Sequence, residues 1–370
     1  MSVINFESTN CKNCYACVRA CPVQSIKIKD EQAIIMEERC IACGLCLKAC
    51  PKNVKKVETE LEKVKSYLNK GEKVAISLAP TCFGVFDVSA QKICGALKKL
   101  GCFYVEETAV GALAVTNAYQ KIQEEMEETC CITSCCASVN LLIEKHFPKL
   151  IPLLIPVLTP LMVHARLLKQ KYGHETKVVF IGPCLAKKIE GEEDEFIDAV
   201  LTIEELIQWI SEEHLDFDQV ESMNLDATEQ SQRTYPIVGG MSSCFTKRKK
   251  NIEIVPVDGI EDCIKVLEGI ERREFENCFF EMSACHHSCI GGPAIGDKEV
   301  NIFKRKMRIK KYRELNDPNQ IPASQTYPLH VNVGRIFKNK YAPILQPSEK
   351  EIEQILNHIG KYSSADELNC

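Results

Sequence analysis

The sequence lacks any uninterrupted apolar run long enough to span a membrane, and it has no low-complexity segment. Its start, MSVINFESTN, has neither a basic stretch nor an apolar core, so we expect no secretory signal. The formal net charge of -5 shows no excess of basic residues, which argues against nucleic acid or an anionic membrane as a partner. Together these absences predict a cytoplasmic protein.

Cysteine, in contrast, is abundant, with 22 residues in a chain of 370. In the reducing cytosol, many cysteines indicate metal sites more often than disulfides. The alternative is a secreted protein held together by disulfides. The length allows two or three domains with a sizeable core.

Changes in composition divide the chain into four parts. Residues 1–56 hold eight cysteines and little apolar material, and residues 57–72 predict a charged linker helix. Residues 73–345 alternate short apolar runs with amphipathic segments, which predicts an α/β domain of mostly parallel sheets flanked by helices. Residues 346–370 predict a capped helix and a polar tail that ends in Cys370.

One motif occurs twice, at a period of 29 residues: CKNCYACVRACP begins at Cys11 and CIACGLCLKACP at Cys40. Each copy reads C-x2-C-x2-C-x3-C-P, the spacing of bacterial ferredoxins with two [4Fe-4S] clusters, where the fourth cysteine binds the other cluster. A pair of zinc sites is the alternative, although zinc ligands usually come as C-x2-C pairs with a long spacer. We therefore predict an α+β ferredoxin-like domain that transfers electrons. One cluster would be held by Cys11, Cys14, Cys17 and Cys50, and the other by Cys40, Cys43, Cys46 and Cys21.

Three more cysteine motifs lie far apart: TSCC at 133–136, GPCLAK at 182–187 and EMSACHHSCIGGP at 281–293. C-x3-C in the last motif places two thiols on one face of a helical turn, and the glycines after it let the backbone approach a bulky cofactor. Scattered core cysteines are the alternative on spacing alone. Soft thiolate ligands for a third cubane would be Cys136, Cys184, Cys285 and Cys289.

In their order and separation, these motifs resemble those of the [FeFe] hydrogenases, and the resemblance runs from the ferredoxin repeat to about residue 345. It implies interconversion of H2 with protons and electrons at an H-cluster. This cofactor is a [4Fe-4S] cubane bridged to a diiron unit that carries CO, CN⁻ and azadithiolate ligands. The resemblance also implies maturation proteins that make the diiron unit, and a redox or signalling protein as partner.

The resemblance assigns roles to the residues of the motifs. The four cysteines of the three motifs would hold the cubane, and Cys289 would also bridge to the diiron unit. Cys135 matches a thiol that passes protons between the cofactor and the protein, with an inert buried thiol as the alternative. Lys187 matches a lysine that binds a cyanide ligand, with a surface lysine as the alternative. The residues expected to pack around the cofactor are Ala79, Pro80, Thr81 and Pro183.

Several positions depart from the family pattern. Ser283 and Gly182 stand where the family has methionines beside the diiron unit, which predicts a roomier or more polar pocket. Leu161 replaces a glutamine near the cofactor, and the helix predicted at 110–120 has none of the acids that usually relay protons beyond Cys135. Candidate replacements for this relay are His286, His287, Glu281 and Glu253.

These departures are similar to those of the sensory branch of the family. The tail YSSADELNC also resembles the start of a four-cysteine module found in sensory members. We therefore expect a slow hydrogenase that detects H2. The alternatives are a metabolic hydrogenase linked to ferredoxin, and an iron–sulfur assembly scaffold without the diiron unit. Cys135 and Lys187 argue against the scaffold, which would have no use for them.

Overall fold

The structure is a computed structural model. It describes residues 3–6, 11–29, 32–52, 55–127, 129–296, 300–315, 322, 327, 331–344, 347–363 and 366. The tail cysteine, Cys370, lies outside these residues. Within the described part of the chain, no helix is both long and apolar enough to cross a membrane.

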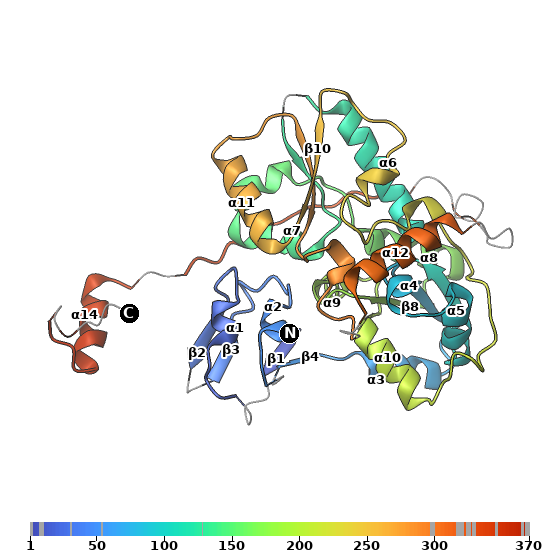
Figure 1. The fold of residues 1–370 in the computed structure, drawn as a ribbon, viewed down its shortest axis with the longest axis horizontal. Coiled ribbons are helices and arrows are strands. Elements are labelled where there is room, and N and C mark those ends of the chain that lie inside the picture. The colour runs from blue at the N-terminus through green and yellow to red at the C-terminus, as the bar shows by residue number, and fades with distance from the viewer. Residues whose placement is uncertain are drawn as a thin grey trace.

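Two parallel sheets form the larger part of the molecule (Figure 1). One inner strand of the four-stranded sheet, β5 (Val74–Leu78), is buried along its whole length, as expected for a parallel strand covered on both faces. The four-stranded sheet has the order β6 (Tyr104–Glu107), β5 (Val74–Leu78), β8 (Lys177–Gly182), β9 (Ala199–Thr202). The three-stranded sheet has the order β10 (Glu253–Asp258), β11 (Cys278–Ser283), β7 (Cys131–Ile132).

Helices flank both sheets. On β5, Ile76 packs with residues of α5 on one face of the sheet, while Ala75 packs with residues of α6 and α8 on the other. The helices of this part are α3 (Leu61–Asn69), α4 (Cys82–Val85), α5 (Ala90–Lys99), α6 (Ala109–Glu125), α7 (Ala137–His146), α8 (Pro160–Tyr172), α9 (Ala186–Glu192), α10 (Ile203–Glu212), α11 (Ile260–Glu271) and α12 (Ile302–Glu314). Short 3-10 turns are η2 (Pro148–Leu153), η3 (Gln230–Gln232), η4 (Ser242–Cys244) and η5 (Ser288–Gly291).

The N-terminal part is a small α+β unit with two antiparallel strand pairs and two one-turn helices (Figure 1). Strand β1 (Ile4–Phe6) pairs with β4 (Lys55–Val57), and β2 (Ile26–Lys29) pairs with β3 (Gln32–Ile35). The helices are α1 (Ala16–Arg19) and α2 (Leu45–Lys48). The predicted fold class, an α/β domain preceded by a ferredoxin-like α+β unit, is therefore confirmed.

The second ferredoxin motif packs against the larger part. Gly44 has a φ of 74°, and a Cβ there would lie 2.5 Å from the ring of Pro293. Only glycine combines this conformation with so close an approach. The Lys48 ammonium donates to the carbonyl oxygen of Gly291 at 3.0 Å, and Lys145 donates to that of Cys40 at 2.6 Å. The ferredoxin-like unit is thereby fixed beside the third of the long cysteine motifs.

The proposed division into four parts stays a prediction. Helix α3 lies within the predicted linker at 57–72, and β4 pairs back onto β1 across the predicted end of the first part. Near the C-terminus, α14 (Glu349–His358) begins with a capping box in which Ser348 and Glu351 satisfy each other's backbone amides.

Candidate active site

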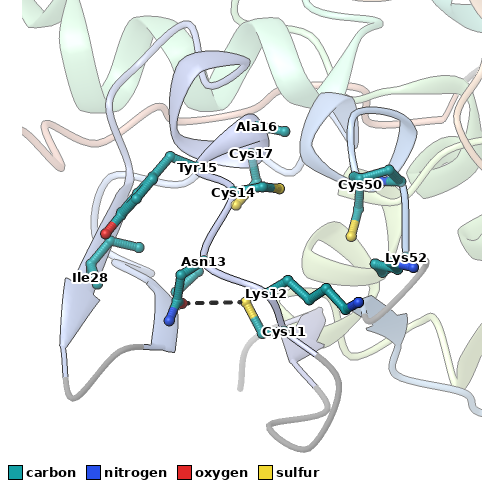
Figure 2. Close-up of a pocket in the computed structure, with 12 residues that line it drawn as sticks. Cys11, Lys12, Asn13, Cys14, Tyr15, Ala16, Cys17, Ile28, Cys50 and Lys52 are labelled. Atoms are coloured by element: carbon teal, nitrogen blue, oxygen red, sulfur yellow. Dashed lines mark hydrogen bonds between the residues drawn. The ribbon is translucent and has the colours of Figure 1, made fainter.

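Two cavities in the ferredoxin-like unit each gather four cysteines. The first is lined by Cys11, Cys14, Cys17 and Cys50 (Figure 2), and the second by Cys21, Cys40, Cys43 and Cys46. These are the two sets expected from the crossed pattern of the repeat. Burial and the neighbouring thiols Cys46, Cys40 and Cys21 raise the pKa of Cys43 to about 12, although a hydrogen bond from the backbone of Leu45 acts against the rise. Thiolates this close need the positive charge of a metal cluster to coexist.

The crossed grouping predicts how cysteine substitutions combine. Cys50→Ser should remove the cluster of the first cavity, so adding Cys14→Ser should cause no further loss of iron. Adding Cys43→Ser to Cys50→Ser should remove the second cluster as well. Iron and sulfide analysis with EPR of the reduced protein would measure both combinations. A further loss with Cys14→Ser but none with Cys43→Ser would mean that the motifs do not exchange their fourth ligands.

A third cavity is lined by residues that follow the carboxyl ends of strands in both parallel sheets. Ligand sites of α/β folds are built at this edge, where loops from several strands meet. Its lining consists of Ala79, Pro80, Thr81, Thr108, Cys135, Cys136, Pro160, Leu161, Phe180, Pro183, Cys184, Lys187, Tyr235, Pro236, Met241, Glu281, Met282, Ser283, Ser288 and Cys289.

The four thiols of the long motifs lie near one another around this cavity. Cys136, Cys184 and Cys289 line it. Burial raises the pKa of Cys184 to about 11, and Cys136 adds to the rise. Cys285 is outside the lining, yet its pKa is raised first by burial and then by Cys184, Cys136 and Cys289. This set of four soft donors, three half-buried and Cys289 exposed to the cavity, fits an iron–sulfur cubane.

The TSCC loop is held rigidly in front of α7. Ser134 donates its hydroxyl to the carbonyl oxygen of Val157 at 2.6 Å and its amide to the hydroxyl of Tyr119 at 2.8 Å. Asn140 closes the turn by donating to the carbonyl oxygen of Ser134 at 2.8 Å. Cys136 then forms the N-cap position of α7. These bonds fix two adjacent cysteines in the wall of the same cavity.

Cys135 is the second thiol of that wall. Burial raises its pKa well above the usual range, and Glu281, Cys136 and Cys289 raise it further, whereas Lys187 lowers it. The thiol is therefore protonated at neutral pH in the absence of any other charge. It can serve as a proton donor beside the cubane thiols, which Cys136 cannot do while it binds metal.

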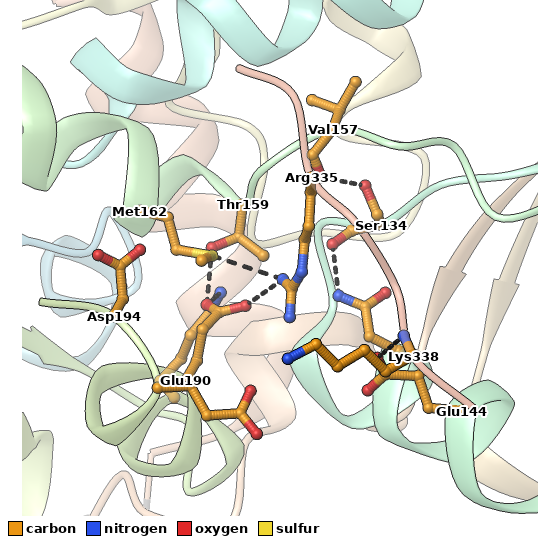
Figure 3. Close-up of polar contacts among 12 residues, drawn as sticks. Ser134, Glu144, Val157, Thr159, Met162, Glu190, Asp194, Arg335 and Lys338 are labelled. Atoms are coloured by element: carbon orange, nitrogen blue, oxygen red, sulfur yellow. Dashed lines mark hydrogen bonds and ion pairs between the residues drawn. The ribbon is translucent and has the colours of Figure 1, made fainter. Parts of the chain in front are cut away.

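Lys187 reaches the cavity from α9 and is buried. Its ammonium pairs with the carboxylate of Glu190, one turn along the helix. The same carboxylate accepts from Thr159 at 2.7 Å and from Arg335 at 2.7 Å (Figure 3). Burial alone would raise the pKa of Glu190, but Lys187 and Arg335 outweigh it and lower the pKa. Two cations and one anion leave a net positive charge at the cavity, which fits an anionic cofactor.

Glu281 also lines the cavity, from the carboxyl end of β11. Its carboxylate accepts from the backbone amides of Met241 at 3.1 Å and Ser242 at 2.9 Å. Burial raises its pKa, although the two amides act against the rise. Of the four candidate replacements for the proton relay, Glu281 is the one that lies in the cavity wall.

The other three candidates lie elsewhere. His286 and His287 line a surface groove, and 63% of the His286 side chain is exposed beside Glu261. The amide of His287 donates to the Asp258 carboxylate at 2.8 Å, which turns this part of the motif outward. Glu253 is exposed at the amino end of β10, the end opposite to that which forms the cavity. These three residues are not placed to receive a proton from Cys135.

The pocket departs from the expected shape at Gly182. A Cβ at Gly182 would lie 2.5 Å from the ring of Phe180, so the aromatic ring fills the space that a side chain there would occupy. The absence of a side chain at Gly182 therefore does not enlarge the cavity, because the ring of Phe180 takes that space and forms part of the cavity wall. The expected polar character is present at Ser283, which does line it.

Several lining residues carry no signal in the sequence. Thr108, Phe180, Tyr235 and Met241 belong to no cysteine motif. The Tyr235 hydroxyl lies 2.8 Å from that of Thr116 on α6, and its chain segment between α10 and β10 has no regular periodicity that would place it. Such residues can be found only from the packing of the fold.

Comparisons with known proteins agree with this site. The family model described as "Iron only hydrogenase large subunit, C-terminal domain" matches residues 72–293, and a 4Fe-4S dicluster domain model matches residues 10–96. The fold and site define an iron–sulfur oxidoreductase. Since the first model matches more than half of the chain, the protein belongs to the iron-only, or [FeFe], hydrogenase family.

Solved structures show the same fold at low sequence identity. A variant of [FeFe]-hydrogenase HydA1 from Chlamydomonas reinhardtii is 15% identical, with a TM-score of 0.59 over 77% of this chain and 100% of that one. A HydA structure from a study of stepwise H-cluster assembly is 16% identical, with a TM-score of 0.56 over 73% of this chain and 92% of that one. Curated proteins give no significant match.

Proposed function

We propose that this protein is a hydrogenase that interconverts H2 with protons and electrons slowly and serves to sense H2. The observation that carries the proposal is that Cys135 and Lys187 line the same cavity as Cys136, Cys184 and Cys289. A scaffold that held only a cubane would need four thiols, but neither a fifth thiol in the same wall nor a buried cation, which is costly to bury.

In this proposal, each part of the cavity wall has a task. Lys187 would hold a cyanide ligand of the diiron unit, while Ala79, Pro80, Thr81 and Pro183 would pack around it and exclude water. When bound, the diiron unit would supply the place where H2 is split. Cys135 would hold the exchanged proton at its Sγ atom. The cubane ligands would be Cys136, Cys184, Cys285 and Cys289, with Cys289 also bridging to the diiron unit.

The packing of the ferredoxin-like unit supports a direction for the electrons. The second cavity, with Cys43, lies in the motif that contacts Pro293 and Gly291, next to the cubane cysteines. The first cavity includes Cys14, which is exposed. Electrons would therefore pass from the cubane to the cluster of the second cavity, then to that of the first, and leave to a redox or signalling partner.

Slow turnover is supported by the missing acids. The first turn of α6 contains no acidic residue, so the relay that the family pattern places on this helix is missing. General acid–base groups contribute about 10²–10⁴-fold to rates, so a reduced relay slows the enzyme without abolishing the reaction.

Glu281→Gln should lower H2 turnover about tenfold or more, because the amide keeps the shape of the carboxyl group but cannot take up a proton. Since burial raises the pKa of Glu281, its carboxyl group stays protonated to a higher pH than usual. The wild-type rate should therefore fall on the acidic side of this raised pKa, where the group no longer accepts a proton.

The Glu281→Gln variant should lack that acidic limb of the pH profile. Turnover by dye-linked H2 oxidation from pH 5 to 9 would measure the effect. Glu253→Gln is the matched control, because Glu253 lies at the opposite end of the neighbouring strand. A profile unchanged by Glu281→Gln would exclude the proton role.

Loading the anaerobically purified protein with a synthetic diiron complex tests the proposed function itself. Infrared bands of CO and CN⁻ that shift under H2 are expected, together with slow turnover. Fast turnover with ferredoxin would favour the metabolic hydrogenase instead. If the cubane is fully occupied and no such bands appear, the protein would be a scaffold.

A further inference from the structure

A second set of buried polar residues begins at the cavity and leads away from Glu281. Thr108, at the end of β6, lines the cavity. Its hydroxyl lies 2.8 Å from the hydroxyl of Ser77 on β5, which lies 2.9 Å from Nδ1 of His164 on α8. Ser77 and His164 are both fully buried. A continuous hydrogen-bonded path therefore runs from the cavity into the core.

The path continues to solvent on the far side of His164. Nε2 of His164 lies 3.2 Å from a carboxylate oxygen of Glu106 on β6, and the other oxygen accepts from Lys171 at 2.8 Å. The Glu106 side chain is fully buried, whereas 24% of the Lys171 side chain is exposed. We call the five residues Thr108, Ser77, His164, Glu106 and Lys171 the His164 line.

The parallel sheet builds this line directly. Ser77 and Glu106 are paired across β5 and β6, so their side chains leave the same face of the sheet. That face is covered by α8, which places His164 over the pair, and Lys171 lies two turns further along the same helix. Gly111 of α6 allows the two helices to approach, because a Cβ there would lie 2.3 Å from the carbonyl oxygen of Pro160.

The charges along the line can hold a mobile proton. Burial alone would raise the pKa of Glu106, but His164 and Lys171 lower it to about 2. The carboxylate is therefore ionised at neutral pH and accepts hydrogen bonds along the line. The titratable groups that face the line are the hydroxyls of Tyr172 and Tyr327, both donating to Glu106 at 2.6 Å, and at longer range Asp226.

The neighbouring carboxylate shows what a purely structural arrangement looks like. Glu107, the next residue of β6, is equally buried, and its carboxylate accepts from the Arg233 guanidinium at 2.9 Å and from Tyr312. A guanidinium does not release its proton in proteins. Glu106 differs because each of its partners along the line can both accept and donate a proton.

We propose that the His164 line carries protons between the cavity and solvent, an inference that rests on the proposed function. For an outgoing proton, Thr108 passes it to Ser77, which gives its own proton to Nδ1 of His164. The imidazolium then loses its Nε2 proton to Glu106. Lys171, after releasing a proton to water, takes the proton from Glu106. One proton leaves the cavity, and the imidazole exchanges tautomers before the next passage.

His164→Gln tests the line, because glutamine can hydrogen-bond Ser77 or Glu106 but does not titrate. In protein loaded with the synthetic diiron complex, the H2-driven shift of the CO and CN⁻ infrared bands should slow at least tenfold at pH 7. Its pH dependence should flatten, while the band positions stay unchanged. Tyr172→Phe is the matched control: it removes another hydrogen bond to Glu106 but leaves the line intact, so the rate should stay within twofold.

A second readout does not need the diiron unit. In protein with 15N-labelled histidine, the NMR signal lost in His164→Gln should show a proton on Nε2 and none on Nδ1, the tautomer that accepts from Ser77 and donates to Glu106. If His164→Gln does not fold, Ser77→Ala interrupts the line one step nearer the cavity and should slow the shift equally.

The possible failures are distinguishable. Suppose that the infrared bands of the wild-type protein shift under H2, and that they shift as fast in His164→Gln or Ser77→Ala. This result would overturn the His164 line and leave the proposed function standing. Slowing by Tyr172→Phe as strong as by His164→Gln would show a structural role for the whole cluster and would also overturn the line. A wild-type protein without CO and CN⁻ bands would overturn the proposed function and the line with it.

Discussion

Cys135→Ala should lower H2 turnover by about 10²–10⁴-fold, the range that a positioned acid or base contributes. The half-buried thiol lies in the cavity wall beside Cys136, and the His164 line begins at Thr108 in the lining of the same cavity. Without the thiol, the first transfer between the cofactor and the protein would have to cross an apolar gap. Each proton hop needs hydrogen-bond reach, so this step would then limit the rate.

The infrared spectrum separates this effect from loss of the cofactor. Cys135→Ala should keep its CO and CN⁻ bands at full intensity, because the cubane thiols and Lys187 are untouched. Cys135→Ser should retain more turnover than alanine, since a hydroxyl can still relay a proton. Cys131→Ala is the control, because Cys131 lies on β7 just before the loop and outside the cavity lining. Turnover by Cys135→Ala equal to that of Cys131→Ala would mean that Cys135 is an inert thiol.

Much of the site could be predicted from the sequence because the spacing of cysteines is local information. In each repeat three closely spaced thiols face one cluster and the fourth, just before the proline, faces the other, so the repeat predicts the crossed sets that the two cavities gather. The long motifs each follow a strand, and parallel strands bring their carboxyl ends to one edge. For this reason Cys136, after β7, and Cys285, after β11, could be expected to meet, whereas Cys184 follows β8 of the other sheet and joins them only through the packing of the two sheets.

The remaining residues depend on packing that no local pattern records. His286 and His287 lie inside a cysteine motif. In the structure, the amide of His287 donates to the Asp258 carboxylate, and both histidines line a surface groove. His164, in contrast, is a single histidine in an ordinary helix. Its proposed role follows only from the sheet, which pairs Ser77 with Glu106 beneath the imidazole. Sequence motifs thus predict the metal ligands, while the proposed proton-carrying groups follow from the topology.

Lys187→Met should reduce the diiron content of the loaded protein at least tenfold. The ammonium is buried at the cavity, and an anionic cofactor that enters a dry pocket needs a positive charge to replace its hydration. Glu190 would remain paired with Arg335 and Thr159, so the fold should survive, but the remaining charges would balance and leave no excess cation. Removing one partner of a buried charge interaction costs about 3–5 kcal/mol, which is more than enough for a tenfold loss.

Lys188→Met provides the matched control for this prediction. Lys188 is the next residue of α9 and is equally buried, but it pairs with Glu205 at 3.0 Å and donates to the carbonyl oxygen of Val200 at 2.7 Å, away from the cavity. Both variants lose a buried cation, so both should melt at a lower temperature, whereas only Lys187→Met should lose the intensity of the CO and CN⁻ bands per cubane. Equal loading of the two variants would show that the charge of Lys187 serves the fold. In that case the ion pair with Glu190 would be its whole role, and the cofactor would have to be held by the thiols and the shape of the cavity.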